Sequence, residues 1–408
     1  MKIDTMRRVD YLAGIPLCFI ASLWVQLTGW FGRAVSGKPA RVLFVELSEM
    51  GSAILVDPAM RRIQQDTGCE LYFVIFRSNA VSLRLLATVP EKNVFTIRDG
   101  GLLTLVVDSL RYLWWTRQQG IDTVIDLELF SRYSALLTGL SGASRRVGFH
   151  PFHNEGLYRG AMLTHRVAYN PHQHIAKNFV ALVNATLSSR PELPYSKRHV
   201  SDEEIILARA PEDPDNQARV KARIVAEYPD YDEARQRIVL INPNASDLLP
   251  QRRWMPASFV AVMQGLLADY DDLLILITGA PAERAEAAVL KQQVDSDRCI
   301  NFAGRLQLEE MVPLYQLADL MLTNDSGPAH FSAVTGLRCF VIFGPETPHL
   351  YGSLGNASAI YAGLACSPCV SASNHRKTPC TDNVCLQVIS VAQVLQELRS
   401  ELDGGALA

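Results

Sequence analysis

Short apolar runs that alternate with amphipathic stretches of helical period fill the chain from Ala40 onward. The first series includes ARVLFVEL, ELYFVIF, VFTI and IDTVIDLEL, and the second includes RIVLINPN, LLILITGA, CINFAG, DLMLTND and RCFVIFG. Strands that each lead into a helix are typical of a parallel sheet covered on both faces. The sequence therefore predicts an α/β protein with two successive Rossmann-like domains facing a cleft. Ligands of such folds bind beyond the carboxyl ends of the strands.

Composition at residues 186–204 (TLSSRPELPYSKRHVSDEE) changes to Pro, Ser and charge, which is typical of a linker. We therefore predict a hydrophobic segment at 1–39, an N-terminal domain at 40–200, a C-terminal domain at 201–385 with a Cys-rich loop at 366–385, and a C-terminal helix and tail at 386–408. The 408 residues suffice for two domains, and the net charge of -3 indicates no general basic face. We expect no nucleic-acid partner.

The segment from Tyr11 to Gly32 contains no charged side chain, and basic residues flank it on both sides. A secretory signal peptide is disfavoured because no convincing cleavage site follows this run. A straight transmembrane helix is disfavoured because Gly14 and Pro16 interrupt the run. A broken or interfacial helix with both ends on one side of the membrane suits the symmetric flanks best. A true span and a helix docked on the core of the protein remain alternatives. The expected location is the cytoplasmic face of the inner membrane, peripheral or monotopic.

The strand DLMLTND ends at Asn324 and Asp325 and leads into SGPAHF. Ser326 is a good N-cap, Gly327 permits close backbone approach, and His330 lies in the first helical turn. Free amides at a helix start favour anions, so this segment is a candidate diphosphate site. The alternative is an ordinary helix start.

Other strand ends of the second series carry small, polar or cationic residues. INPNASDLLPQRRW brings short polar groups and two arginines that can bind phosphate oxygens in a bidentate manner, and LITGAPAER brings a carboxylate that can accept from ribose hydroxyls. GPETP ends a fourth strand. These candidate donor-binding residues are Asn242, Asn244, Ser246, Arg252, Arg253, Glu283 and Thr347.

On these motifs the chain resembles glycosyltransferase family nine, the heptosyltransferase-like enzymes of lipopolysaccharide assembly. The resemblance rests on NDSGPAHFSAVTG, CFVIFGPETP, INPNAS and VELSEMGSAILVDPAMRRI, and runs from about Arg41 to Cys385. It implies a GT-B fold and an inverting transfer from a nucleotide-diphosphate sugar, which is ADP-heptose in the best-known members. It also implies no metal ion at the donor diphosphate and a lipid acceptor at the cytoplasmic membrane face.

The same resemblance places Asp325, Ser326, Gly327 and His330 on the donor block of the family. Asn244 and Ser246 fall on the first loop of the C-terminal domain, Arg252 or Arg253 on the phosphate-binding basic position, and Glu283 near the acidic nucleotide contact.

The family's first loop usually reads Gly-Asp, with the Asp as general base, but here Ser52 stands in the Asp position. A serine hydroxyl is not a base near neutral pH, so another carboxylate is needed. We predict Glu49 as the base, with Glu46, Asp57 or Asp126 as weaker candidates. The candidate catalytic residues are thus Glu49, Ser52 and Asp325. The alternative is a loop without transfer activity.

Histidines and arginines gather between residues 145 and 174. No pair of these histidines has the i, i+4 spacing of a zinc-binding helix, so an acceptor-side loop is the better interpretation. The arginines either contact acceptor phosphates or are exposed and solvated. The residues are His150, His153, His165, His172 and His174, and Arg145, Arg146, Arg159 and Arg166.

Four cysteines near the C-terminus, Cys366, Cys369, Cys380 and Cys385, form the pattern C-x2-C-x10-C-x4-C. Their spacing suits a structural zinc ion, while packed thiols, a disulfide or an iron-sulfur cluster remain alternatives. In each case the role is to hold a loop, and no cofactor is expected for catalysis.

The sequence thus predicts a membrane-associated inverting glycosyltransferase that moves heptose or a related sugar to a lipid-linked or lipopolysaccharide-type acceptor. The alternatives are a catalytically silent nucleotide-sugar-binding scaffold of a polysaccharide assembly complex, and a nucleotide-sugar epimerase or hydrolase.

Overall fold

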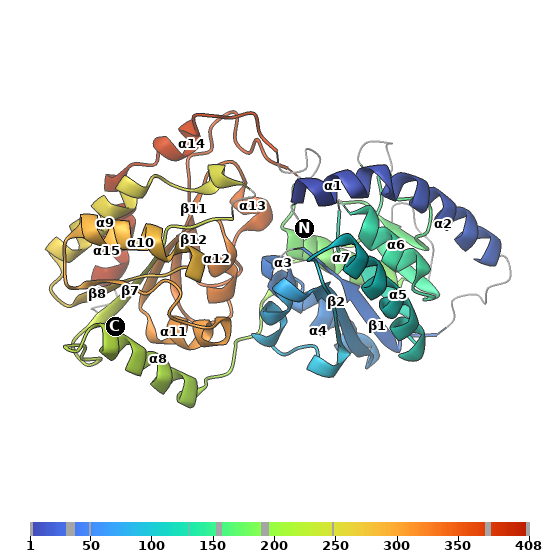
Figure 1. Cartoon of the computed structure of the whole chain (residues 1–408), viewed down its shortest axis with the longest axis horizontal. Coiled ribbons are helices and arrows are strands. Elements are labelled where there is room, and N and C mark those ends of the chain that lie inside the picture. The colour runs from blue at the N-terminus through green and yellow to red at the C-terminus, as the bar shows by residue number, and fades with distance from the viewer. Residues whose placement is uncertain are drawn as a thin grey trace. The chain divides into compact units, whose positions relative to one another are not determined.

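A computed structural model of the chain describes residues 3–29, 37–48, 50–129, 131–151, 157–188, 196–246, 249–371 and 377–404. The chain forms two compact units, Met1–Ala208 and Arg209–Ala408. Each unit contains one six-stranded sheet in which every strand pair is parallel (Figure 1). The predicted α/β class with two Rossmann-like domains is confirmed.

The first unit has the strand order β3-β2-β1-β4-β5-β6. Its strands are β1 (Arg41–Val45), β2 (Glu70–Phe76), β3 (Val94–Ile97), β4 (Thr123–Asp126), β5 (Arg145–Phe149) and β6 (His165–Val167). Its helices are α1 (Ile3–Leu12), α2 (Gly14–Gly29), α3 (Met50–Leu55), α4 (Asp57–Thr67), α5 (Leu102–Gln118), α6 (Arg132–Leu140) and α7 (Ile175–Leu187), with the 3-10 turns η1 (Arg77–Arg84), η2 (Glu91–Asn93) and η3 (Glu203–Ile205).

The second unit repeats this arrangement, with the order β12-β11-β10-β7-β8-β9. Its strands are β7 (Arg237–Asn242), β8 (Leu273–Ile277), β9 (Cys299–Asn301), β10 (Leu320–Asn324), β11 (Arg338–Phe343) and β12 (Ala357–Tyr361). Its helices are α8 (Pro214–Glu227), α9 (Pro256–Asp269), α10 (Arg284–Val294), α11 (Met311–Leu317), α12 (Gly327–Ser332), α13 (Pro348–Tyr351), α14 (Val384–Gln387) and α15 (Val391–Gly404), with the 3-10 turns η4 (Pro250–Arg252), η5 (Pro281–Glu283) and η6 (Leu308–Glu310).

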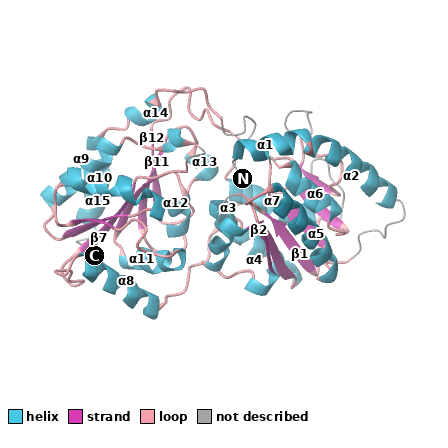
Figure 2. Cartoon of the chain, in the orientation of Figure 1, coloured by secondary structure: helices cyan, strands magenta, loops and turns pink. Residues whose placement is uncertain are grey.

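The central strands of both sheets are buried along their length, which explains their continuous apolar sequences. Strand β8 is buried at every residue, and β1 at every residue after Arg41. Helices pack on the sheets, as the colouring by secondary structure shows (Figure 2). A parallel strand covered on both faces has no solvent side on which polar residues could alternate.

The unit boundary lies at Ala208, beyond the predicted boundary at residue 200. The segment after the predicted linker stays with the first unit because Glu204 pairs with Arg62 of α4 and the amide of Ala208 donates to Asp57 at 3.4 Å. At the other end, α15 is part of the second core rather than a separate tail, since Leu398 on this helix is fully buried.

The described N-terminal residues form two helices, α1 and α2, and the part from Thr5 to Thr28 is bent by 43° at Ala13. The uncharged run begins at the last two residues of α1 and includes all of α2. No single helix of the described residues is long and apolar enough to cross a membrane, although this bent pair passes by length and composition. Both helices lie against α6. Asp10 accepts hydrogen bonds from the amides of Arg132 and Tyr133 at 2.9 and 3.0 Å, and its other oxygen pairs with the Arg132 guanidinium at 3.1 Å.

Helix α2 buries one side and exposes the other. Ser22 donates to the carbonyl of Cys18 at 2.6 Å and accepts from the amide of Ala161 at 2.8 Å. A Cβ at Gly160, which has a φ of +77°, would lie 2.4 Å from the Ser22 hydroxyl, so glycine is needed at this contact. The opposite side exposes Leu17, Phe19, Ile20, Leu23, Trp24 and Leu27. The apolar run is therefore docked on its own domain along one side only.

Asp10→Ala should lower the free energy of unfolding of the first unit by about 2 kcal/mol. The change removes the acceptor of two amides in the first turn of α6, each hydrogen bond contributing about 1 kcal/mol, and leaves the buried Arg132 side chain without its carboxylate. Urea titration followed by hydrogen exchange of the α6 amides measures the effect. The matched control is Asp66→Ala, which removes a partly exposed partner of Arg62 and should cost less than about 0.5 kcal/mol. Equal effects of the two variants would contradict the docking role of Asp10.

Candidate functional site

The order of strands in the second sheet reverses between β7 and β10, which pair directly. On one side of this point the strands follow as β8 and β9, and on the other side as β11 and β12. Ligands of open parallel sheets bind outside the carboxyl ends of the strands at such a reversal. The segments after β7 and β10 contain most of the residues that the sequence predicted for donor binding.

Asn324, the last residue of β10, connects these segments. Its side-chain amide donates to the carbonyl of Pro243 at 2.8 Å, and its side-chain oxygen accepts from the amide of Trp254 at 3.0 Å. Trp254 is itself buried, with its indole nitrogen donating to the carbonyl of Ile389 at 3.2 Å. The loop after β7 and the segment around η4 are therefore fastened to the end of β10. Sequence reasoning noted Asn324 only as the end of a strand.

Arg252 and Arg253 are adjacent but have different roles. An Nη atom of Arg252 lies 3.5 Å from a carboxylate oxygen of Asp325, and the exposed fractions of the two side chains are 15% and 5%. The Nε of Arg252 is buried and has no hydrogen-bond partner within the described part of the chain. Arg253 donates twice to the carbonyl of Ala245, at 3.0 and 2.7 Å, and so holds the loop after β7. In the described part of the chain, Arg252 therefore pairs with Asp325 and has a buried Nε left for a ligand, while Arg253 holds a loop.

Asn244 and Glu283 come together beside Gly279. The Asn244 amide lies 3.4 Å from the carbonyl of Thr278, and the Glu283 carboxylate accepts from the amide of Ala280 at 2.6 Å. A Cβ at Gly279 would lie 2.8 Å from both side chains, so the absence of a side chain there is what admits them. The structure thus groups two predicted nucleotide contacts from consecutive loops of the sheet.

The start of α12 is less specialised than the sequence suggested. Ser326 does not cap the helix, because its hydroxyl donates to the carbonyl of Asn324 at 3.1 Å. Gly327 has no left-handed backbone, and a Cβ there would meet the ring of Phe331 at an ordinary 3.4 Å. The helix has only six residues, which limits its dipole. His330 lies within this helix and is partly buried.

Two further predicted donor residues differ in their structural setting. Thr347 caps α13 by accepting from the amide of His349 at 3.3 Å, which is a structural role for its hydroxyl. Ser246 lies at the exposed end of the described loop after β7. Neither residue is held by the contacts that join Asn244, Arg252 and Asp325 to the strand ends.

In the first unit the corresponding reversal lies between β1 and β4. Glu128 follows β4, is buried, and accepts from the amides of Leu47 and Ser48 at 3.0 and 3.3 Å and from the Ser48 hydroxyl at 2.8 Å. Asn79 donates to the carbonyl of Leu47 at 3.0 Å. Sequence reasoning missed Glu128, although its position just after a strand adjacent to β1 was a usable signal.

The predicted base Glu49 lies outside the described residues. Ser52 is buried in α3, and Glu46 is buried directly after β1. Asp57 is fully buried, accepts from Arg61 at 2.8 Å and from Thr88 at 2.5 Å, and so serves to hold α4 in place.

Asp126 forms a buried ion pair with Arg159. Burial raises the pKa of the Asp126 carboxyl, against the lowering effect of the Arg159 charge. Its second oxygen accepts from the amide of Glu128 at 3.1 Å. Both carboxylates, Asp57 and Asp126, are thus committed to internal contacts, which makes them poor candidates for the base.

The arginines of segment 145–166 correct the sequence interpretation, which had them either on acceptor phosphates or solvated. Arg159 is buried against Asp126, Arg145 donates to the carbonyl of Gly37, and Arg146 donates to the carbonyls of Met162 and Ala143 at 2.7 and 2.5 Å. Three of the four are therefore structural, and Arg166 is partly buried.

The histidines that the structure describes differ in burial and in their contacts. His153 lies outside the described residues, and His174 caps α7 by accepting from the amide of Ala176 at 3.2 Å. Burial lowers the pKa of both His150 and His165. His172 is exposed. Among the described residues, no three His, Cys, Asp or Glu side chains are placed so that they could hold a metal ion.

The four C-terminal cysteines are free thiols in this structure. Burial raises the pKa of the Cys385 thiol, and the charges of Cys369, Cys380 and Cys366 raise it further. The four thiols are not arranged as metal ligands within the part of the chain that the structure describes. Cys366 is exposed and Cys385 is buried, so the structural zinc ion and its alternatives all stay predictions.

Solved structures similar to this chain include the E. coli ADP-heptose LPS heptosyltransferase II, at a TM-score of 0.69 and 16% identity, with 90% of this chain and 99% of that chain covered. E. coli heptosyltransferase WaaC with ADP is similar at a TM-score of 0.59 and 18% identity, with 88% of this chain and 99% of that chain covered. At such identities the likeness shows the fold, which is that of GT-B heptosyltransferases.

A curated relative, lipooligosaccharide heptosyltransferase 2 of Campylobacter jejuni, is 27% identical over 179 residues, which are 42% of this chain and 53% of the relative. The chain thus spans about half the length of the curated relatives it matches. The model of glycosyltransferase family 9 (heptosyltransferase) matches residues 115–378, well over half of the chain. By this match the chain belongs to glycosyltransferase family 9.

Proposed function

We propose that this chain is an inverting glycosyltransferase that moves heptose or a related sugar from a nucleotide-diphosphate sugar, such as ADP-heptose, to a lipid-linked or lipopolysaccharide-type acceptor. Family membership supports transfer, and the names of the relatives support a heptose donor and a lipooligosaccharide acceptor. We further propose that the protein acts at the cytoplasmic face of the inner membrane, held as a peripheral or monotopic protein. The exposed apolar side of α2 supports this location.

The observation that carries the proposal is the setting of Arg252. Its buried Nε has no hydrogen-bond partner in the described ranges, and Asp325 lies 3.5 Å from its Nη. A buried donor without a partner costs free energy, and a bound anion removes that cost. A guanidinium can donate two parallel hydrogen bonds to phosphate oxygens. Arg252 would therefore bind the donor diphosphate, and Asp325 would orient the guanidinium.

In the proposed mechanism an acceptor hydroxyl attacks the anomeric carbon of the donor while the bond to the diphosphate breaks. The departing nucleotide diphosphate takes the electron pair of that bond, and Arg252 stabilises its charge. Asn244 and Glu283 lie beside Gly279, where the Glu283 carboxylate can accept from ribose hydroxyls. A base removes the proton of the attacking hydroxyl.

For the base we propose Glu49, which follows Ser48 in the chain. Glu128 acts through the backbone instead, because it accepts from both Leu47 and Ser48 and so fixes the entry to this loop. It is a positioning residue in this scheme.

The test of the function measures nucleotide release by the full-length protein in detergent. With ADP-heptose as donor, release should require an added lipopolysaccharide-precursor lipid extract. Release without lipid would indicate hydrolysis, and nucleotide binding without any release would indicate a silent binding protein; either result would overturn the proposal.

Arg252→Gln should weaken the binding of ADP about 10- to 100-fold, because a hydrogen bond to a charged group contributes roughly 1.5–3 kcal/mol. Calorimetric titration with ADP measures the change. The control is Arg219→Gln, which alters an exposed arginine on α8 and should leave the affinity unchanged. If both variants bind ADP like the unchanged protein, Arg252 does not hold the diphosphate.

Glu49→Gln should lower kcat about 100- to 10,000-fold, since general-base catalysis contributes that much. It should also remove the fall of the rate at acidic pH that protonation of the base causes. Glu128→Gln keeps an acceptor for Leu47 and Ser48, so its kcat should fall less and its pH profile should keep its shape. Steady-state rates between pH 5 and 9 distinguish the two. A reversed pattern would assign the base to Glu128 and reject Glu49.

A further inference from the structure

Helix α5 exposes a second row of large apolar side chains outside the N-terminal hydrophobic run. The exposed fractions of Leu103, Leu110 and Trp114 are 78%, 64% and 66%, and Leu102, Val106 and Val107 are also exposed. Residues 103, 107, 110 and 114 recur at three- and four-residue intervals, which places them on one face of the helix. The amphipathic pattern of α5 thus points an apolar face outward.

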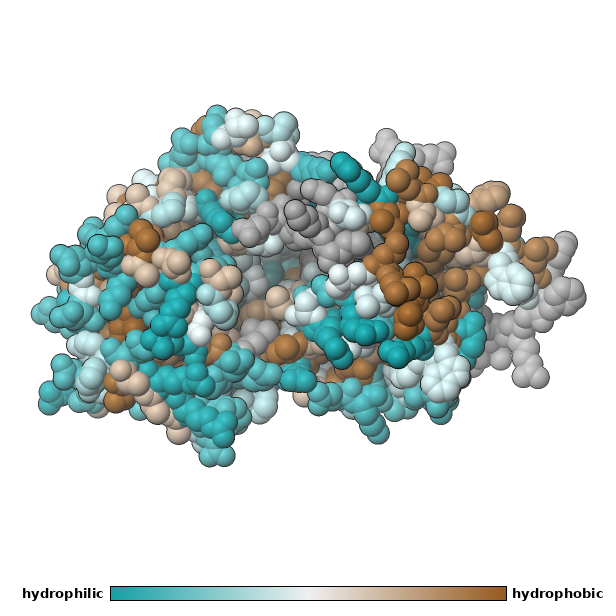
Figure 3. Space-filling view, in the orientation of Figure 1, coloured by the Kyte–Doolittle hydropathy of each residue, from teal (hydrophilic) through white to brown (hydrophobic). Residues whose placement is uncertain are grey.

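This face of α5 and the exposed side of α2 belong to the same part of the first unit. Both helices pack on α6, and Ser109 of α5 is hydrogen-bonded to Tyr133 of α6 at 2.7 Å. The space-filling view shows hydrophobic residues gathered over α2 and α5 (Figure 3). We call these exposed residues of α2 and α5 the apolar face. Contiguous exposed apolar surface on a soluble domain commonly marks a protein or membrane contact.

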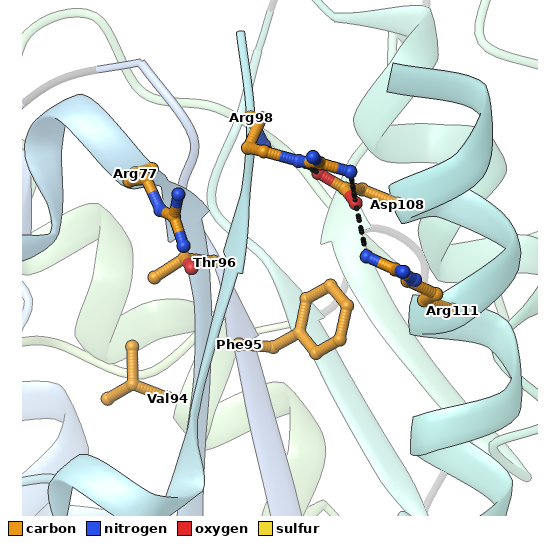
Figure 4. A pocket seen from close by; sticks show the side chains of 7 residues that line it. All are labelled: Arg77, Val94, Phe95, Thr96, Arg98, Asp108 and Arg111. Atoms are coloured by element: carbon orange, nitrogen blue, oxygen red, sulfur yellow. Dashed lines mark hydrogen bonds and ion pairs between the residues drawn. The ribbon is translucent and has the colours of Figure 1, made fainter. Parts of the chain in front are cut away.

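A basic pocket lies on another side of α5, between this helix and β3. It has a volume of about 350 Å³ and is lined by Arg77, Arg98, Arg111 and Asp108, together with three residues of β3 (Figure 4). Three arginines and one aspartate leave two positive charges in excess. The pocket therefore has the charge that an anionic group requires.

Asp108 orients two of the arginines rather than neutralising the pocket. Its side chain is 5% exposed and accepts from Arg98 at 2.8 Å through each oxygen, while Arg111 lies 3.5 Å away. The hydrogen bond from Arg98 holds the pKa of Asp108 at about 2. The Arg111 side chain is 66% exposed, and Arg77 forms no ion pair with any described residue. Two guanidinium groups thus keep donors for a ligand.

We propose that the first unit docks on the surface of an anionic lipid bilayer through the apolar face, and that the pocket of Arg77, Arg98 and Arg111 binds a lipid phosphate at that surface. Tryptophan and tyrosine favour the headgroup region, and Tyr11, Trp24 and Trp114 are exposed on α1, α2 and α5. Arg7 and Arg8 of α1 are exposed near the start of the same segment. This combination of aliphatic, aromatic and basic groups is complementary to an anionic leaflet.

The inference deepens the proposed function and rests on its membrane location, but not on the proposed sugar transfer. Its test does not use sugar transfer. The full-length protein is mixed with vesicles of phosphatidylcholine, or of phosphatidylcholine with phosphatidylglycerol, and the bound fraction is measured by flotation. Binding should be stronger to the anionic vesicles and should weaken with added salt.

Two sets of variants separate the parts of the proposal. The double variant Arg77→Gln with Arg111→Gln should bind anionic vesicles about fivefold more weakly for each charge removed. Its binding to neutral vesicles should not change. Leu110→Ser with Trp114→Ser should weaken binding to both kinds about tenfold or more. Matched controls are Arg219→Gln and Val289→Ser, which change an exposed arginine and an exposed valine of the second unit and should have no effect.

Several outcomes would overturn the inference. These are equal binding of the charge variants and the unchanged protein to the anionic vesicles, equal binding of the unchanged protein to both kinds of vesicle, or a dimer that Leu110→Ser dissociates while vesicles are not bound. Acceptor-dependent transfer in detergent by a protein that does not float with vesicles would reject the docking and the proposed membrane location, and would leave the proposed transfer intact. Vesicle binding without transfer would reject the proposed function and leave the docking intact.

Discussion

Reversal of strand order between two directly paired parallel strands is the constraint on which both candidate sites depend. It lies between β1 and β4 in the first unit and between β7 and β10 in the second. The connections on either side of such a point lead away from each other, which opens a crevice at the carboxyl ends of the strands. In each unit a side chain at or after the second strand fastens the loop of the first: Glu128 holds Leu47 and Ser48, and Asn324 holds Pro243.

The contacts around Arg252 show how a buried polar group can be left for a ligand. Its neighbour Arg253 donates two hydrogen bonds to the carbonyl of Ala245. In the first unit, Asp57, Asp126 and Arg159 likewise bind partners within the protein. Folded proteins satisfy nearly all of their buried polar atoms, and the buried Nε of Arg252, which has no partner in the described chain, lies on a residue that pairs with Asp325 at the end of β10, where ligands of such sheets bind.

The N-terminal helices contact their own domain on one side and expose apolar side chains on the other. Asp10 and Ser22 make specific polar contacts with α6 and with the backbone of Ala161, and these contacts hold α1 and α2 on the domain. The outer side of α2 stays apolar and exposed, and α5 extends that surface with Leu103, Leu110 and Trp114. A helix docked along one side can present its other side to an interface without leaving its own fold.

Periodicity and strand-end composition alone determined the α/β class, the two sheets, and the strand ends that carry Asn244, Arg252, Glu283 and Asp325, because carboxyl ends of parallel strands share one edge of a sheet. They did not distinguish Arg252 from Arg253, reveal Glu128 as the residue that holds the first loop, or show that Thr347 caps α13. Nor did the uncharged run from Tyr11 to Gly32 show which of its side chains are buried. Only the tertiary structure decided these points, because hydrogen-bond partners and burial depend on residues that lie tens of positions away in the chain.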